Sequence, residues 1–363
     1  MNKHYPLFYL AISFLLGALS VLSFAPFNYH FISLLSLSGL FYIWHRLSNA
    51  RQGFLSGLFF GLGLFAFGIS WIYISLNTYG GMPSWLSCLS TFLFCLFCAF
   101  FTGLIGWFSL HKKSSFFLIP FIWTFFEWIK GWVFTGFPWL TMGYSQVPSS
   151  PLVGFLPIIG IYGLTLILTS LALILSLVLL NKDKRSKLLR IGLVAAVLVS
   201  GQLLKNIEWT EPTGKPISIS LVQGNIAQDI KWQKETVTQT LQTYQKLIQK
   251  TKGQIILLPE TALPLLAEYI PETFKKSVLL HTSKVKGHVL IGAIERQDAK
   301  YFNVVLNLGG DSSQVYRKSH LVPFGEFIPL KFIFQYIYMH YLNMPMNDLS
   351  RGSNRQEPMA IKN

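Results

Sequence analysis

The sequence predicts a multi-pass α-helical membrane domain followed by a water-soluble α/β domain. Composition is the first observation behind this prediction: hydrophobic residues make up 52% of the chain, charged residues only 12%, and the mean hydropathy is +0.45. These values exclude an ordinary soluble enzyme. The order of apolar and polar residues is the second observation: long apolar runs stop near Lys205, and alternating strand and helix patterns follow. We therefore expect residues 1–204 to form the membrane domain and residues 205–363 a separate domain.

Seven apolar runs approach the roughly 20 residues that a helix needs to cross a bilayer. They cover residues 7–24, 31–44, 54–76, 86–108, 116–133, 157–180 and 188–204. The second and seventh are short, so the expected number of spans is about seven. The first run resembles a signal peptide in length, but no small-residue cleavage site follows it.

The placement of basic residues predicts the topology. Except for Lys130, the Lys and Arg residues of the membrane domain fall at the N-terminus or after the second, fourth and sixth runs. The loops after the first, third and fifth runs have none. This is the positive-inside pattern, which places the N-terminus in the cytoplasm and the soluble domain across the membrane. The net charge of +15 therefore reflects topology, and we expect no nucleic-acid partner.

The three cysteines, Cys88, Cys95 and Cys98, all lie in the fourth apolar run. Their spacing puts them on one helical face. We expect them to pack as small apolar side chains, because a thiolate is disfavoured in hydrocarbon. The soluble domain has no cysteine and therefore no disulfide. The sequence shows no metal-ligand cluster and no phosphate-binding glycine-rich loop, so we expect no cofactor and no metal.

The soluble domain alternates between strand and helix patterns. Strands are predicted at residues 217–226, 254–258, 289–294 and 304–308, with a short one beginning at Val315. Helices are predicted at residues 231–252 and 271–283, the second opened by Pro271 in its first turn. Two strand–helix pairs followed by adjacent strands predict helices packed on a sheet that is not purely parallel.

Glu260 and Lys318 each follow a predicted strand directly. Open α/β sheets place catalytic groups at strand ends, so we expect these side chains to converge at one sheet edge. A carboxylate there can accept a proton and an ammonium group can stabilise an oxyanion. The alternative, which is the commoner case, is two solvated residues or a surface ion pair.

Three segments of the soluble domain carry a family resemblance. Residues 221–232 (LVQGNIAQDIKW), 257–264 (LLPETALP) and 316–329 (YRKSHLVPFGEFIP) resemble the nitrilase superfamily, and specifically its membrane branch, the apolipoprotein N-acyltransferases. In the membrane domain, residues 23–27 (SFAPF), 68–76 (GISWIYISL) and 123–140 (WTFFEWIKGWVFTGFPWL) resemble the helices of the same family. The resemblance implies a nitrilase-like α/β sandwich for residues 205–363.

The resemblance also implies an activity. Members transfer an acyl chain from a phospholipid to the N-terminal amine of a diacylglyceryl-cysteine lipoprotein, at the periplasmic face of the bacterial inner membrane. The implied partners are a phospholipid acyl donor, a diacylated apolipoprotein acceptor and membrane lipids, and the protein is expected to be monomeric. A membrane-anchored nitrilase-like amidase is an alternative that shares the same residues.

The family uses a Glu-Lys-Cys triad and a thioester intermediate. By the motif match, Glu260 is the general base and Lys318 stabilises the oxyanion. Glu326 matches a further glutamate near the site; its alternative is a carboxylate that caps the turn after Val322. Trp232 matches an aromatic residue at the lipid entrance, and its alternative is core or interface packing. His320 is expected to be a surface residue.

The family's nucleophile lies in a Cys-Tyr-Glu-like motif beyond the loop that begins near Asn347, and these 363 residues contain no such motif. We expect the nitrilase-like domain to be incomplete at its C-terminus, with open sheet edges and an uncovered apolar face. By itself the chain is then expected to be inactive. It is either a remnant or a chain that a second piece completes.

Glu127 and Lys130 are the only charged residues inside the predicted spans. Intramembrane charges are functional candidates, here as a contact for the phospholipid headgroup. The alternative is a neutralising helix pair that reaches the interface. A transporter is disfavoured, because it needs polar residues across several spans.

Overall fold

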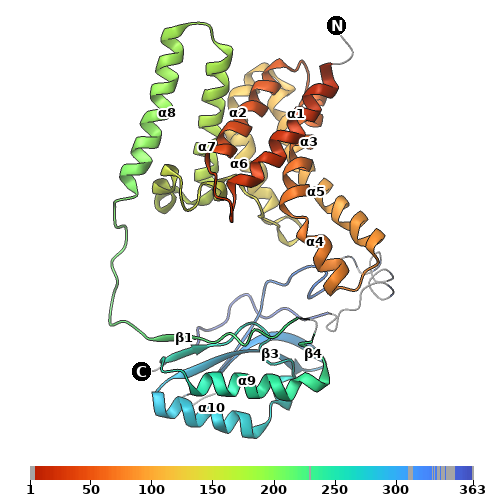
Figure 1. Ribbon diagram of the computed structural model, residues 1–363, viewed down its shortest axis with the longest axis vertical. Coiled ribbons are helices and arrows are strands. Elements are labelled where there is room, and N and C mark those ends of the chain that lie inside the picture. The colour runs from red at the N-terminus through yellow and green to blue at the C-terminus, as the bar shows by residue number, and fades with distance from the viewer. Residues whose placement is uncertain are drawn as a thin grey trace. The chain divides into compact units, whose positions relative to one another are not determined.

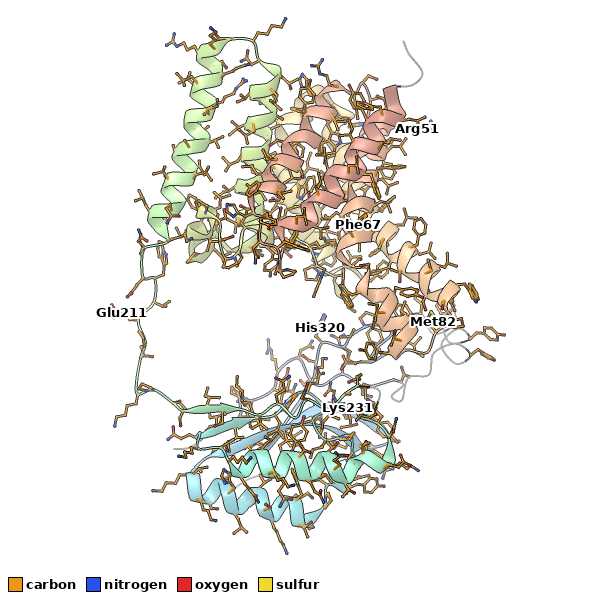
Figure 2. All side chains as sticks on the ribbon, in the orientation of Figure 1. Arg51, Phe67, Met82, Glu211, Lys231 and His320 are labelled. Carbon is orange, nitrogen blue, oxygen red and sulfur yellow. The ribbon has the colours of Figure 1, made fainter. Side chains whose placement is uncertain are left out.

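The computed structural model describes residues 5–361, apart from 229, 310–313, 329, 331, 333–335, 337–339 and 341–347. The chain divides into two compact units (Figure 1). The helical unit comprises Met1–Asn77 and Pro83–Glu211, and the sheet unit comprises Thr78–Met82 and Pro212–Asn363. Glu211, the last residue of the helical unit, lies in the extended stretch that follows the last long helix (Figure 2).

Each predicted span falls on a helix of the helical unit. These helices are α1 (Tyr5–Ser20), α2 (Phe31–Arg46), α3 (Ala50–Gly68), α5 (Ser84–His111), α6 (Ile119–Lys130), α7 (Leu156–Leu180) and α8 (Lys184–Leu204). Among the described residues, four helices are long and apolar enough to cross a membrane: α3, α5, α7 with the turn before it, and α8. The number of crossings stays a prediction.

The third predicted span, residues 54–76, was wrong as one continuous helix. Helix α3 ends at Gly68, and a separate short helix α4 (Trp71–Ile74) and a turn of π-helix (Ser75–Tyr79) follow. A side chain at Gly68 would run into Leu140. Gly68 thus leaves room for a residue far along the chain, which the local apolar pattern does not contain.

Small residues let α3 lie close to α1 and α5. A side chain at Gly57 would collide with the backbone of Thr102, and one at Gly63 with the backbone of Phe14. Close packing through glycine is the usual way for helices to associate in lipid, where no hydrophobic force drives them together. The glycines of α3 thus fix the centre of the helical unit.

The sheet unit has a five-stranded mixed sheet, which confirms the predicted fold class. Its strands are β1 (Ile219–Leu221), β2 (Ile255–Leu257), β3 (His288–Gln297), β4 (Lys300–Leu308) and β5 (Gln314–Arg317), in the order β1-β2-β3-β4-β5. The first three run parallel, and β3, β4 and β5 are antiparallel neighbours. Helices α9 (Val237–Gln249) and α10 (Glu272–Val285) lie on the same face of the sheet (Figure 1).

The core of the sheet unit lies between these helices and the sheet. Alternate residues of the strands point toward the helices. The buried side chains include Ile256, Val289, Ile291 and Val304 from the sheet, with Tyr244, Ile248, Phe274 and Val278 from the helices. The opposite face of the sheet keeps apolar side chains in the open: Leu221 is 80% exposed, Ile219 55% and Tyr316 42%. Among the described residues, this face is therefore exposed at β1 and at Tyr316, and the expected uncovered apolar face stays a prediction.

Two predicted elements of this unit were too long. The helix predicted from Lys231 begins at Val237, because the Thr236 hydroxyl donates to the Ile230 carbonyl (2.7 Å) and closes a turn there. The strand predicted for residues 217–226 ends at Leu221. Asn225 then has a φ of 50°, a left-handed backbone that a strand does not accommodate.

Candidate active site

Glu260 and Lys318 lie together in the sheet unit, although β2 and β5 are not neighbours in the sheet. Lys318 Nζ is 3.1 Å from Glu260 Oε1. After β2 the chain passes across β3 at Gly292, where a side chain would collide with the backbone of Pro259 and Thr261. Gly292 therefore lets the backbone carry Glu260 across the sheet toward Lys318, which follows β5 directly.

Two further side chains complete the cluster, Asn303 from β4 and Glu326. The Asn303 amide Nδ2 donates to Glu260 Oε1 and to Glu326 Oε1 (2.9 Å). Lys318 Nζ also bonds both carboxylates and lies 3.0 Å from Glu326 Oε1. Two carboxylates thus share two donors, which reduces the repulsion between their charges and fixes their separation.

Sequence reasoning missed Asn303. It lies on the face of β4 that points away from α9 and α10, where Asn307 is the other asparagine. Both are buried, Asn303 to 6% and Asn307 to 1% exposure. Two polar residues at strand spacing within an apolar run (FNVVLNL) are the signal that points to them, since buried amides need partners.

Glu326 has both of the contacts that the two readings of the sequence predicted. Its Oε2 accepts a hydrogen bond from the Val322 backbone N–H (2.8 Å), which caps the turn. Its Oε1 accepts hydrogen bonds from Lys318 Nζ and Asn303 Nδ2. The Phe324 N–H donates a hydrogen bond to the Phe327 carbonyl (2.7 Å) and closes the turn. One side chain therefore ties the turn to the cluster.

The cluster favours the charged forms of Glu260 and Lys318. Burial raises the pKa of Glu260, but hydrogen bonds from Lys318 and Asn303 outweigh it and bring the pKa below its usual value. For Lys318 burial lowers the pKa, and the bonds to Glu326 and Glu260 outweigh it and raise the pKa. The Glu260 side chain is 61% exposed and that of Glu326 only 13%, so Glu260 is the more accessible of the two carboxylates.

A cavity of about 270 Å³ opens beside the pair. Its walls combine polar groups with the apolar side chains of Val305 and Tyr316. Lys231 lies at the same place: its Nζ is 3.5 Å from the Glu260 carbonyl oxygen and 5.8 Å from the Trp232 ring centroid. Burial lowers the pKa of Lys231.

Trp232 is half-buried next to Lys231, and its predicted role at a lipid entrance stays a prediction. His320 is exposed, as expected; it and Lys231 are labelled in Figure 2.

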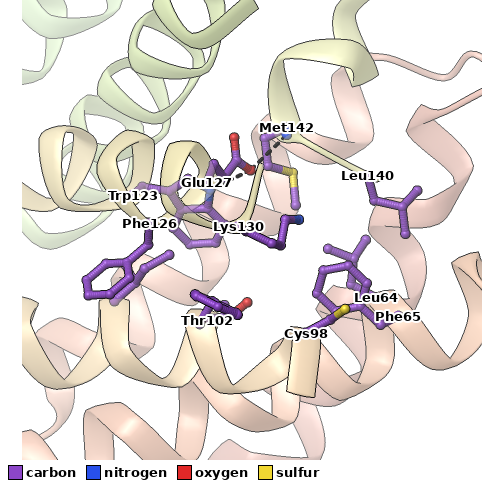
Figure 3. Close-up of a pocket in the computed structure, with 12 residues that line it drawn as sticks. Leu64, Phe65, Cys98, Thr102, Trp123, Phe126, Glu127, Lys130, Leu140 and Met142 are labelled. Carbon is purple, nitrogen blue, oxygen red and sulfur yellow. Dashed lines mark hydrogen bonds between the residues drawn. The ribbon is translucent and has the colours of Figure 1, made fainter. Parts of the chain in front are cut away.

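Glu127 and Lys130 belong to the helical unit, where both are buried (Figure 3). Glu127 accepts hydrogen bonds from Trp123 Nε1 (3.0 Å), the Met142 backbone N–H (2.9 Å) and Thr165 Oγ1 (2.9 Å). The two side chains are only 6% and 5% exposed, and the alternative of a pair that reaches the membrane interface stays a prediction.

Lys130 Nζ donates to the Trp139 carbonyl (3.1 Å) and lies 4.8 Å from the Phe65 ring centroid. Both charged side chains border a cavity of about 20 Å³. The described contacts of the two charges are with protein groups, and the predicted headgroup contact stays a prediction.

The cysteines lie on α5. Cys95 and Cys98 are buried as expected, but Cys88 is exposed, so the expectation of packing was wrong for Cys88. It lies in the first turns of α5, where spacing alone does not show whether a neighbouring helix covers the face. Within the described ranges no group of three or more His, Cys, Asp or Glu residues is placed to hold a metal ion.

The fold and the site define a class: a helical membrane unit joined to a carbon–nitrogen hydrolase-type domain with a Glu–Lys pair. Family models agree with this class. The apolipoprotein N-acyltransferase N-terminal domain matches residues 16–174, and carbon–nitrogen hydrolase matches residues 218–359. The chain belongs to the apolipoprotein N-acyltransferase family.

Relatives that carry this name match nearly the whole chain. The protein of Nitrosomonas europaea is 40% identical over 361 residues, which cover 98% of this chain and 72% of the relative. That of Ralstonia nicotianae is 36% identical over 358 residues (96% and 67%), and that of Coxiella burnetii 35% over 362 residues (97% and 73%). The family, together with four helices of spanning length, indicates an inner-membrane protein.

Proposed function

We propose that this chain carries part of the machinery for phospholipid-dependent N-acylation of the N-terminal diacylglyceryl-cysteine of apolipoproteins. The observation that carries the proposal is the Glu260–Lys318 pair, with an Nζ–Oε1 distance of 3.1 Å, in a chain whose relatives have that name. We further propose that the sheet unit lies in the periplasm and the N-terminus in the cytoplasm, and that the protein acts as a monomer.

The proposed chemistry divides one acyl transfer into two steps. Glu260 takes the proton of a thiol, and the thiolate attacks the ester carbonyl of the phospholipid. Lys318 stabilises the negative oxygen of the tetrahedral intermediate, which collapses to a thioester and a lysophospholipid. The N-terminal amine of the lipoprotein then attacks the thioester, forms the amide and regenerates the thiol.

The thiol is the group that the sheet unit does not provide, because all three cysteines of the 363 residues lie on α5. We therefore propose that a thiol from outside these residues completes the site. The same observation favours a second candidate, an inactive remnant that no second piece completes.

A reconstitution experiment tests the proposal. The 363-residue chain is compared, in phospholipid vesicles with a diacylated lipopeptide, with the same chain joined to the unmatched remainder of the Nitrosomonas relative. Mass spectrometry of the lipopeptide is expected to show one added acyl chain with the joined protein only. A joined protein that hydrolyses a soluble amide instead would favour the amidase. Acylation by the 363 residues alone would refute the external thiol.

Topology gives a separate prediction. A periplasm-active phosphatase fused after Leu266 is expected to be active, because seven crossings from a cytoplasmic N-terminus end in the periplasm. The matched control is a fusion after Asn181, in the basic connection between α7 and α8, which is expected to be inactive. The opposite pattern of phosphatase activity in whole cells would reverse the proposed orientation.

Asn303→Leu is expected to lower acyl transfer in the joined protein by about 10- to 100-fold, because Glu260 and Glu326 lose a shared donor worth roughly 1.5–3 kcal/mol. The matched control is Asn307→Leu, which changes a buried asparagine on the same face of β4 that contacts His288 and Gln314 instead. Initial rates of both variants check the prediction. Equal losses would mean that Asn303 serves the fold and not the site.

A further inference from the structure

A segment late in the chain, residues 349–356, runs beside the residues that carry Lys318 and Glu326. The Gly352 N–H donates to the Lys318 carbonyl (2.9 Å), and the Leu349 N–H donates to the Glu326 carbonyl (2.7 Å). The 349–356 segment therefore holds both ends of the loop 318–326, which supplies two of the four side chains of the cluster.

Gln356 binds the residue immediately before Lys318. The Arg317 N–H donates to Gln356 Oε1 (2.9 Å), and Gln356 Nε2 donates to the Arg317 carbonyl (2.7 Å). Since β5 is an edge of the sheet formed by the described strands, these two backbone groups face away from β4. The Lys318 N–H points toward β4 and donates a hydrogen bond to the Asn303 carbonyl (2.8 Å). One side-chain amide thus takes the place of a partner strand at the end of β5.

Other contacts of the segment agree with this arrangement. A side chain at Gly352 would collide with the Arg317 carbonyl, so only glycine allows this close approach. Arg351 Nε donates to the Ser319 carbonyl (2.8 Å). Leu349 is 8% exposed and anchors the start of the segment.

From its present backbone position the Lys318 amine reaches both carboxylates. Its distances to Glu260 Oε1 (3.1 Å) and Glu326 Oε1 (3.0 Å) lie inside the limit of roughly 3.5 Å for such hydrogen bonds, so a backbone shift of about half an ångström at a fixed side-chain conformation would break them. We propose that the 349–356 segment, through Gln356, is the positioning element that holds the Lys318 amine between Glu260 and Glu326. Its importance for catalysis rests on the proposed function, whereas the positioning itself is tested without catalysis.

The experiment uses Gln356→Ala in the full 363-residue chain. Amide hydrogen exchange in the peptide 314–319 is expected to be about five- to tenfold faster, because the Arg317 amide loses its acceptor. Labelling of Lys318 by an amine-reactive ester is expected to be faster as well. The ion pairs raise the pKa of Lys318, so an amine that leaves them has a larger neutral, reactive fraction, and the pH profile of labelling moves to lower pH.

Two variants make the comparison specific. Gln249→Ala removes a glutamine whose Nε2 donates to Ser277 Oγ (3.2 Å), and it is expected to leave Lys318 labelling unchanged. Gln356→Glu keeps the acceptor for the Arg317 N–H and loses the donor, so its labelling is expected to be intermediate.

A wild-type rate and pH profile of Lys318 labelling in Gln356→Ala would overturn the proposal. So would exchange that rises equally in α9 and α10, because that marks general unfolding. If Gln356→Ala does not fold, a wild-type labelling rate in Gln356→Glu has the same meaning. Neither readout needs an acyl donor, so failure of the proposed acyl transfer leaves this test intact.

Discussion

Glu260→Gln is expected to lower thioester formation and acyl transfer by about 10³-fold or more in the joined protein, because general bases typically contribute 10²- to 10⁴-fold and here the base also produces the nucleophile. An amide keeps the size and the hydrogen bond to Lys318 but has no site for the proton. Single-turnover mass spectrometry of the acyl-enzyme, followed by lipopeptide acylation, checks both steps.

The matched control is Glu268→Gln. Glu268 is an ion-paired glutamate of the same unit, with its Oε1 2.8 Å from Arg296 Nη2, and it lies away from the cluster. Normal acylation in Glu260→Gln, or an equal loss in Glu268→Gln, would contradict the assignment. Because the folded-state pKa of Glu260 is lowered, the wild-type base stays ionised below the usual glutamate range, and we expect the acid limb of the rate profile to fall below that range.

Glu127→Leu is expected to destabilise the helical unit by about 3–5 kcal/mol, the usual effect of removing one partner from a buried charged network. The change leaves the donors of Trp123, Met142 and Thr165 without their acceptor and the Lys130 ammonium without a nearby negative charge. The midpoint of thermal unfolding of the detergent-solubilised chain measures the effect.

Two further variants of α6 calibrate the result. Glu127→Gln keeps an acceptor and is expected to lose roughly half as much stability. Thr124→Val, whose hydroxyl bonds the Pro120 carbonyl of its own helix (2.9 Å), is expected to change little. An unchanged midpoint in Glu127→Leu would mean that the carboxylate is available for a lipid headgroup rather than needed by the fold.

Local sequence patterns predicted the central Glu–Lys pair of the site but not the residues that position it. Glu260 and Lys318 were found because each follows an apolar strand, and strand ends gather functional groups. Asn303 and Gln356 were not, since each acts through a partner that only tertiary structure supplies: Asn303 through two carboxylates from other loops, Gln356 through the backbone of Arg317.

The same limit applies to the elements of the fold. Apolar residues recur at helical spacing in α9, at Val237, Leu241, Tyr244 and Ile248, and a local period of this kind indicates a buried face. Tyr244 and Ile248 are buried and Leu241 packs against the core. The start of α9 was placed too early, because the Thr236 hydroxyl donates to the Ile230 and Gln233 carbonyls in a turn that the apolar period does not reveal. Gly68, the last residue of α3, packs against Leu140, and no window of sequence around residues 54–76 contains that residue.

The placement of Glu127 has a consequence for biogenesis. Helix α6 has only 12 residues and two charges, and partners for those charges lie later in the chain, at Met142, Thr165 and Trp139. During synthesis, α6 is therefore made before these partners, and Glu127 lacks the Thr165 hydroxyl until α7 has been made. We expect α6 to stay at the membrane–water interface at first and to enter the bilayer together with α7.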